Sequence, residues 1–152
     1  MLKAKDIMTR DVITVNPEAT IKELARLLTD HRISGVPVVN DKGEIAGIVT
    51  ENDLIRKNKR LHIPTVIRLF DAYLLVGSKE MEKEIRNIAA TTVDEICTKE
   101  VVSIDEETTV EEIATIMAEQ HIHLLPVLRG RKVVGIVGKA DMVRAMADEV
   151  SK

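Results

Sequence analysis

The sequence predicts an α/β (α+β) fold built from two copies of one strand–helix–strand–strand–helix unit. The main observation is that residues 7–56 recur, residue type by residue type, at residues 96–144. Within each copy, short β-branched runs alternate with stretches whose apolar residues follow helical spacing. The chain has 152 residues, of which 45% are hydrophobic and 1% aromatic, so an aliphatic core is expected.

Each copy starts with a run of β-branched residues that predicts a short strand, at residues 11–15 and 101–104. Pro17 ends the first run, because proline cannot donate a hydrogen bond to a strand ladder. The two strands are expected to occupy equivalent places in the two units.

A helix follows each strand, and its start is marked by a capping box, a Thr with a Glu three residues later. These pairs are Thr20 with Glu23 and Thr109 with Glu112. The apolar residues at helical spacing are Ile21, Leu24, Ala25, Leu27 and Leu28 in the first copy and Val110, Ile113, Ala114, Ile116 and Met117 in the second.

A hairpin comes next in each copy, because a turn that contains glycine separates two β-branched runs. The paired runs are residues 33–39 and 45–49 in the first copy and residues 122–128 and 133–137 in the second. Pro37 and Pro126 are expected at a strand start or at a sheet edge. The last helix of each unit is expected to begin at residues 50–53 and 138–141.

The predicted domains are residues 1–56 for the first unit, 57–91 for a helical connecting insert and 92–152 for the second unit. The insert has no twin and holds both aromatic residues, Phe70 and Tyr73. It is too apolar for a flexible linker, so it is expected to pack on the repeats or at a subunit interface. Residues 92–95 form a third capping box.

Composition narrows the class of protein. The net charge is −3, which disfavours nucleic acid as a partner because phosphate contacts need a basic surface. No apolar run approaches the length of a membrane span, and the charged N-terminus does not resemble a signal peptide. The single cysteine, Cys97, aligns with Met8 and is expected to fill a small apolar space. A cytoplasmic location is expected.

No catalytic constellation is present in the sequence. The motifs Gly-x-Ser-x-Gly, Gly-x-Gly-x-x-Gly and His-Glu-x-x-His and the phosphate-binding P-loop are all missing. His121 and His123 form a His-x-His pair that could share a face of a strand, but no third ligand is evident nearby. Neither an enzyme nor a metal site is expected.

The repeated segments resemble a known family. Residues 7–9, 32–39 and 47–53, with their counterparts in the second copy, are similar to a tandem pair of cystathionine-β-synthase (CBS) domains, often called a Bateman module. The resemblance implies two units packed sheet to sheet about a pseudo-twofold axis. It also implies two clefts between the units that bind adenosine-containing ligands.

The family's ribose and phosphate signature is Ser/Thr-x-x-Asp at the start of each unit's last helix. The resemblance places Thr50 and Asp53 in one cleft, with adenine against Val101 and Ile122 of the other unit. The same spacing is also that of a helix cap with an acid at N3, which stabilises a helix by about 1 kcal/mol without any ligand. The expected nucleotide-binding residues are Ile33, Ser34, Thr50, Asp53, Val101, Ile122, His123, Gly138, Lys139 and Asp141.

The second copy departs from this pattern at two positions. Gly138 replaces the hydroxyl residue Thr50, and His123 stands where the first copy has Ser34. By resemblance, His123 with Lys139 is expected to contact phosphates in the cleft of Asp141. The cleft of Asp53 shows no equivalent phosphate base, so two sites of unequal affinity are expected.

The resemblance favours a regulatory module that binds AMP, ADP or ATP and passes a shape change to a regulated protein. S-adenosylmethionine and NAD(H) are further candidate ligands. The alternative is a dimeric assembly scaffold with vestigial clefts, which Gly138 and the apolar Leu124 and Leu125 favour for the second cleft. A homodimer is expected, formed through apolar helix surface at Leu24, Leu28, Ile113, Met117, Met142, Val143 and Met146.

Overall fold

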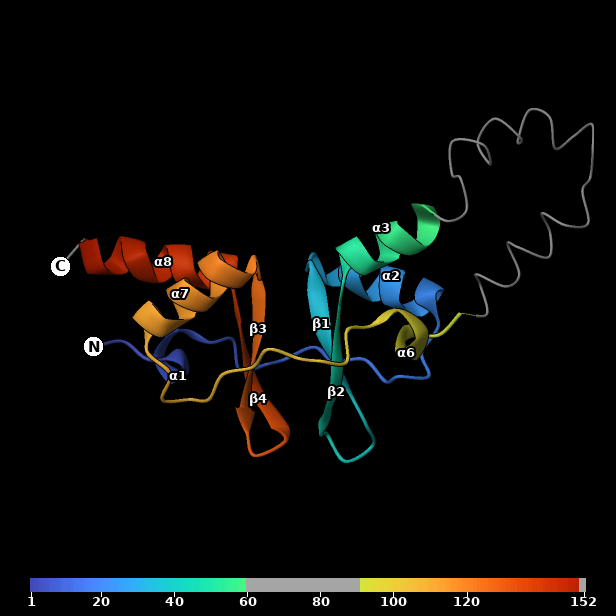
Figure 1. The fold of residues 1–152 in the computed structure, drawn as a ribbon, viewed down its shortest axis with the longest axis horizontal. Coiled ribbons are helices and arrows are strands. Elements are labelled where there is room, and N and C mark those ends of the chain that lie inside the picture. The colour runs from blue at the N-terminus through green and yellow to red at the C-terminus, as the bar shows by residue number, and fades with distance from the viewer. Residues whose placement is uncertain (60–90, 151–152) are drawn as a thin grey trace, which may run out of the picture.

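Two similar halves make up the molecule, one built on each copy of the repeat (Figure 1). The computed structural model describes residues 1–59 and 91–150. The first half contains α2 (Ile21–His31), β1 (Gly35–Val39), β2 (Ile45–Thr50) and α3 (Glu51–Lys59). The second half contains α7 (Val110–Gln120), β3 (Leu124–Arg129), β4 (Lys132–Gly138) and α8 (Lys139–Val150). The predicted mixed fold is therefore confirmed, whereas residues 60–90 of the expected helical insert lie outside the described residues.

Each half is built around a two-stranded antiparallel hairpin, as the turn signals predict. Val36 pairs with Val49 in β1–β2, and Leu125 pairs with Val137 in β3–β4. All four side chains are fully buried. The two hairpins lie side by side at the centre of the molecule, with the helices of each half on the outer side of its hairpin (Figure 1). This arrangement puts both junctions between hairpin and last helix near the contact between the halves.

The first predicted strand of each copy is almost absent. Residues 11–15 and 101–104 keep only single parallel bridges, Val15 to Val38 and Ile104 to Val127. In the first half the Val15 N–H donates to the Pro37 carbonyl over 3.1 Å and the Val39 N–H donates to the Val15 carbonyl over 2.9 Å.

The prolines explain why these strands stop. The next bond of a parallel ladder would need an N–H from Pro37, which proline lacks. Pro126 limits the second half in the same way, since the Ile104 N–H donates to its carbonyl over 3.0 Å. Both prolines lie in the middle of their strands, and each proline nitrogen is on the side of the strand that faces away from the hairpin partner. The prolines therefore lie at a sheet edge, as expected.

Two short helices are exchanged between the halves. The helix α1 (Ala4–Ile7) precedes the first copy in sequence but packs in the second half, where Ala4 and Met8 belong to the core cluster of Ile113. The helix α6 (Val93–Ile96) precedes the second copy but supplies Val93 to the core of the first half. Figure 1 shows the two connecting segments crossing between the halves. Each half therefore depends on the other copy for part of its core.

Backbone hydrogen bonds fix the exchanged helices in place. The Ala4 N–H donates to the Thr108 carbonyl over 2.7 Å, and the Val93 N–H donates to the Ala19 carbonyl over 2.8 Å. The predicted third capping box starts α6, because the Thr92 N–H donates to the Glu95 carboxylate over 3.0 Å. No comparable signal in the sequence predicts α1.

Two glycines let the crossing segments approach the hairpins. A Cβ added to Gly47 would lie 2.9 Å from both Cys97 Sγ and the Thr98 carbonyl oxygen. A Cβ added to Gly135 would lie 2.3 Å from Met8 Sδ. Cys97 and Met8, which align in the repeat, thus occupy equivalent positions against β2 and β4. Burial raises the pKa of the Cys97 thiol, in keeping with its expected role as a small apolar filler.

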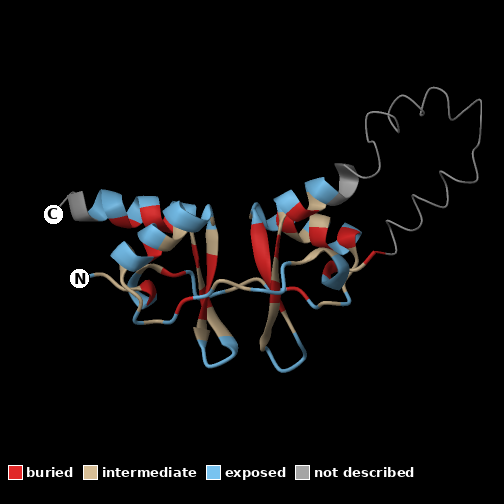
Figure 2. Cartoon of the chain, viewed as in Figure 1, coloured by how far each residue is buried: buried red, intermediate tan, exposed pale blue. Residues whose placement is uncertain are grey.

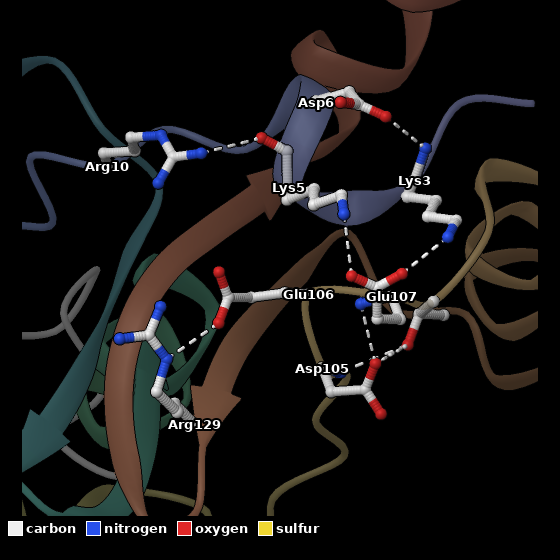
Figure 3. Close-up of polar contacts among 9 residues, drawn as sticks. Lys3, Lys5, Asp6, Arg10, Asp105, Glu106, Glu107 and Arg129 are labelled. Carbon is white, nitrogen blue, oxygen red and sulfur yellow. Dashed lines mark hydrogen bonds and ion pairs between the residues drawn. The ribbon is translucent and has the colours of Figure 1, made fainter.

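Ion pairs tie α1 to the turn that precedes α7 (Figure 3). The Lys3 and Lys5 ammonium groups lie 2.5 Å and 2.8 Å from the two carboxylate oxygens of Glu107. These bonds lower the pKa of Glu107 to about 2. Beside them, Arg129 Nε donates to Glu106 over 2.9 Å. The exchanged helix is thus held by charge as well as by its two core residues.

Most of the apolar helix surface that suggested a dimer is used within the chain. Leu24, Leu28, Ile113 and Met142 are buried in the cores of the two halves (Figure 2). The large apolar side chains that stay exposed on described helices are Ile55 at 63%, Val143 at 59% and Met146 at 59%. None of the helices in residues 1–59 and 91–150 is long and apolar enough to span a membrane.

Candidate functional site

Two clefts lie between the halves, each beside the start of a unit's last helix. The Asp53 cleft, of about 610 Å³, is formed by the end of β2, the start of α3 and residues 98–102 and 121–124 of the other copy. The Asp141 cleft, of about 940 Å³, is formed by the start of α8 and residues 9–13 and 32–35 of the other copy. Both volumes are within the range of roughly 300–1,000 Å³ usual for small-molecule sites.

A buried aspartate caps the helix that borders each cleft. Asp53 is 5% exposed and Asp141 is 8% exposed. The Thr50 N–H donates to Asp53 Oδ2 over 2.9 Å, and the Gly138 N–H donates to Asp141 Oδ2 over 2.7 Å. The Thr50 hydroxyl adds a second bond of 3.3 Å to the same oxygen of Asp53. One oxygen of each carboxylate therefore stabilises the helix start, as the capping interpretation predicts.

The other carboxylate oxygen faces an arginine one turn along the helix. Arg56 pairs with Asp53 Oδ1, and the Arg144 guanidinium lies 3.4 Å from Asp141 Oδ1. The Thr9 hydroxyl donates to Asp141 Oδ1 over 3.5 Å. These partners compensate a charge that would be costly to bury alone. Sequence reasoning missed both arginines, although each follows its aspartate at the same spacing in both copies.

The predicted site residues divide between the two clefts. Thr50, Asp53, Ser34, Ile122 and His123 line the Asp53 cleft. The Asp141 cleft is lined by Ile33, Ser34, His123, Gly138, Lys139 and Asp141. Ser34 and His123, at equivalent positions of the repeat, therefore line both clefts.

The expected position of Val101 needs correction. Val102, and not Val101, lines the Asp53 cleft, and its repeat partner Ile13 lines the Asp141 cleft. On an extended chain neighbouring side chains point to opposite sides, so a shift of one residue changes which one faces the cleft. Together with Ile122 and Ile33, these side chains give each cleft an apolar wall from the opposite copy.

The Asp53 cleft does contain basic groups, contrary to the sequence-based expectation. His121, His123 and Arg56 all line it. The sequence-based expectation places His123 in the Asp141 cleft alone. It borders both because β1 and β3 meet between the clefts, where an added Cβ on Gly35 would lie 3.0 Å from Leu124 Cδ2.

Two residues beside the clefts adopt an unusual backbone conformation. Arg32 ends α2 with φ 53° and ψ 48°, and His121 ends α7 with φ 54° and ψ 42°. This left-handed region favours glycine, and other residues held there cost of order 1–3 kcal/mol and cluster at ligand sites. Arg32 lines the Asp141 cleft and His121 lines the Asp53 cleft. No glycine signals either position in the sequence.

Within residues 1–59 and 91–150, no group of three or more His, Cys, Asp or Glu side chains is arranged to hold a metal ion. His121 and His123 lie at the wall of the Asp53 cleft without a third ligand of these types among the described residues. Each cleft therefore offers a ligand an aspartate paired with an arginine, further charged side chains and an aliphatic wall.

The family model of the CBS domain matches this sequence twice, at residues 4–60 and 93–148. The chain belongs to the CBS domain family. The two matches coincide with the two copies of the repeat and extend over the exchanged helices α1 and α6. The suspected relationship to a tandem CBS pair is thus confirmed.

Several characterised or sequenced proteins are similar to this CBS pair. The uncharacterized protein MJ1426 of Methanocaldococcus jannaschii is 27% identical over 151 residues, covering 93% of this chain and 89% of its own length. The CBS domain pair of protein MJ0100, solved in complex with 5′-methylthioadenosine and S-adenosyl-L-methionine, is 26% identical with a TM-score of 0.73. The alignment covers 98% of both chains.

A longer relative carries a similar segment. Homoserine O-acetyltransferase of Methanosalsum zhilinae is 30% identical over 152 residues, which make up 99% of this chain and 24% of that protein. The similarity therefore concerns a minor part of that protein.

Proposed function

We propose that this CBS pair is a cytoplasmic regulatory module that binds adenosine-containing ligands in its two clefts and is not itself an enzyme. The observation that carries the proposal is the arrangement of each cleft. A buried aspartate at a helix start faces an aliphatic wall supplied by the opposite copy. A carboxylate that accepts bonds from ribose hydroxyls and an apolar slot for a flat base are the two requirements for holding an adenosine.

The arginine beside each aspartate suggests how the group attached to the 5′ position of the adenosine is bound. Arg56 and Arg144 hold Oδ1 of the two aspartates and orient the carboxylates toward the clefts. Both arginines also line the clefts, so we propose that they contact a charged group on the ligand. The relative MJ0100, solved with 5′-methylthioadenosine and S-adenosyl-L-methionine, supports adenosine derivatives as the ligand class.

Signalling follows from where the clefts lie. Each cleft has one wall from each half, so a ligand contacts both halves at once. A ligand that binds one arrangement of the halves more tightly shifts the population toward it. We propose that this shift is passed to a regulated protein or across a homodimer formed through the exposed Ile55, Val143 and Met146.

A dimeric scaffold with vestigial clefts is the second candidate. Its favouring observation is that both aspartates already have partners within the chain, from the cap N–H and from the arginine. A scaffold of this kind would be indifferent to adenosine compounds and would still dimerise.

Thermal unfolding of the whole chain separates the two candidates. AMP, ADP, ATP, S-adenosylmethionine and NADH would each be added in excess. A ligand at about 100 times its dissociation constant adds about 2.7 kcal/mol of stability. The regulatory module predicts a shift with at least one compound, reduced in Asp53→Ala or Asp141→Ala. Asp148→Ala, an exposed change on α8 outside both clefts, is the matched control. Absence of any shift would leave only the scaffold.

A further inference from the structure

The two clefts carry opposite formal charge. The Asp53 cleft is lined by one arginine and three carboxylates, Glu51, Asp53 and Glu100, so its formal charge is −2 with both histidines neutral. The Asp141 cleft is lined by three cations, Arg32, Lys139 and Arg144, and two carboxylates, so its formal charge is +1. In each cleft the charges of one aspartate–arginine pair cancel. The difference in formal charge between the clefts comes from the other charged side chains.

The charge difference arises at equivalent positions of the repeat. Glu51 is the first residue of α3 and Lys139 is the first residue of α8. His121 and Arg32 are likewise equivalent, since each ends the first long helix of its copy in the left-handed conformation. In the part of the chain that the structure describes, Glu51, Lys139 and Arg32 form no side-chain ion pair. Their charges are therefore available to a ligand.

We propose that the clefts select adenosine ligands by the charge of the 5′ substituent. This inference rests on the proposed function and assigns a ligand class to each site. The Asp141 cleft takes a phosphorylated adenosine, whose phosphate is met by the side chains of Arg32 and Lys139. The Asp53 cleft takes an adenosine derivative with a cationic or neutral 5′ substituent, because Glu51 and Glu100 repel phosphate and attract a cation.

Arg32 gives the strongest support for this division. An arginine held at φ 53° is a costly choice where glycine would be free of strain. A guanidinium beside a cleft with surplus positive charge is suited to binding phosphate, which glycine at this position could not do. In the Asp53 cleft the same position carries His121, which has no permanent charge.

Calorimetric titration of the full chain with AMP, and separately with S-adenosylmethionine, tests the proposal. Arg32→Gln is expected to weaken the affinity for AMP about tenfold or more, which corresponds to the loss of one charge-assisted hydrogen bond. The same variant should change the affinity for S-adenosylmethionine less than about twofold. Glu51→Lys is expected to weaken the affinity for S-adenosylmethionine about threefold to tenfold without weakening the affinity for AMP. Arg26→Gln and Glu119→Lys make the same two charge changes on exposed helix surface outside both clefts and should alter neither affinity.

The possible results are distinct. The proposed selection by charge is wrong if Arg32→Gln weakens the affinities for both ligands equally, or if Glu51→Lys leaves the affinity for S-adenosylmethionine unchanged. In either case the proposed binding of adenosine-containing ligands is not contradicted. If neither compound nor adenosine itself binds the unmodified chain, the proposed function fails as well. Arg32→Gly provides a second variant at the critical position, because it removes the guanidinium and the backbone strain together.

Discussion

At the residue scale, Asp53 and Asp141 illustrate how one side chain serves both the fold and the site. One oxygen caps a helix and the other faces an arginine and a cleft. The Thr-x-x-Asp spacing predicts the first role, and the family resemblance suggests the second. The left-handed positions of Arg32 and His121 were not predicted, because neither residue type signals a positive φ.

Arg32→Gly is expected to stabilise the fold while weakening phosphate binding. Glycine occupies the left-handed region without steric cost, so the free energy of unfolding should rise by about 1 kcal/mol. Urea denaturation measures this change. His121→Gly, at the equivalent position, should be stabilised similarly. A loss of stability in both variants would show that the side chains contribute more than the strain costs.

Gly47→Ala is expected to destabilise the protein by about 1–3 kcal/mol, as overpacking does. The new Cβ would lie 2.9 Å from the Thr98 carbonyl oxygen, a backbone atom that cannot move aside by rotating a side chain. Gly138→Ala is the control, since its nearest neighbours lie at 3.6 Å. Equal melting temperatures for the two variants would contradict the close approach of the crossing segment.

At the element scale, the missing first strands show the limit of a propensity argument. Residues 11–15 and 101–104 have strand-like composition, yet a ladder needs a donor at every second residue of the neighbouring strand. Pro37 and Pro126 remove that donor. The long helices and the hairpins are predicted correctly because their signals are local. Of the two capping boxes that start the long helices, Thr109 with Glu112 forms both bonds, whereas Thr20 with Glu23 forms only the bond from the Glu23 N–H to the Thr20 hydroxyl. The exchange of α1 and α6 is not predicted, because the two equivalent copies offer two equivalent packing positions. The sequence does not indicate which helix packs in which half.

The anchoring of α1 should make stability depend on pH through Glu107. Its pKa in the folded protein is about 2, below the ordinary 4.5, so its ion pairs stabilise fully above about pH 5 and are lost as the pH falls toward 2. Glu107→Gln should therefore be less stable than the unmodified protein at pH 7, with the difference shrinking below about pH 4. Urea midpoints across this range measure it.

Glu119→Gln is the matched control for that experiment, because Glu119 is exposed on α7 and forms no ion pair among the described residues. High salt should also reduce the effect of Glu107→Gln, since exposed charges are screened. A difference that stays constant from pH 7 to pH 3 would show that packing, and not the two lysines, holds α1.

At the scale of the whole molecule, the halves are joined through shared cores and shared clefts. The apolar positions left over for a second chain lie on α3 and α8, where Ile55 and Val143 are equivalent in the repeat. The sequence pattern suggested a wider surface. Leu24, Leu28, Ile113 and Met142 proved to be core residues, since helical periodicity does not distinguish a buried face from an interface.

Met146→Glu is expected to weaken a homodimer at least about tenfold, because it places a charge on the most exposed apolar part of α8 that borders neither cleft. Sedimentation velocity over a range of protein concentrations measures the change. Ser103→Glu, an exposed change away from the helices, should leave the association unaffected. A monomer at all concentrations before mutation would refute the dimer itself.

The exchanged helices carry a consequence for the origin of the chain. Because α1 and α6 are the same element of the repeat, a single-copy ancestor would have placed its first helix in the core of another molecule. Such an ancestor is a homodimer with swapped helices, and duplication with fusion turns its association into an intramolecular one that no longer depends on concentration. Fusion also ends the symmetry that forced its two sites to be identical. Only then can one site carry Lys139 while its twin carries Glu51.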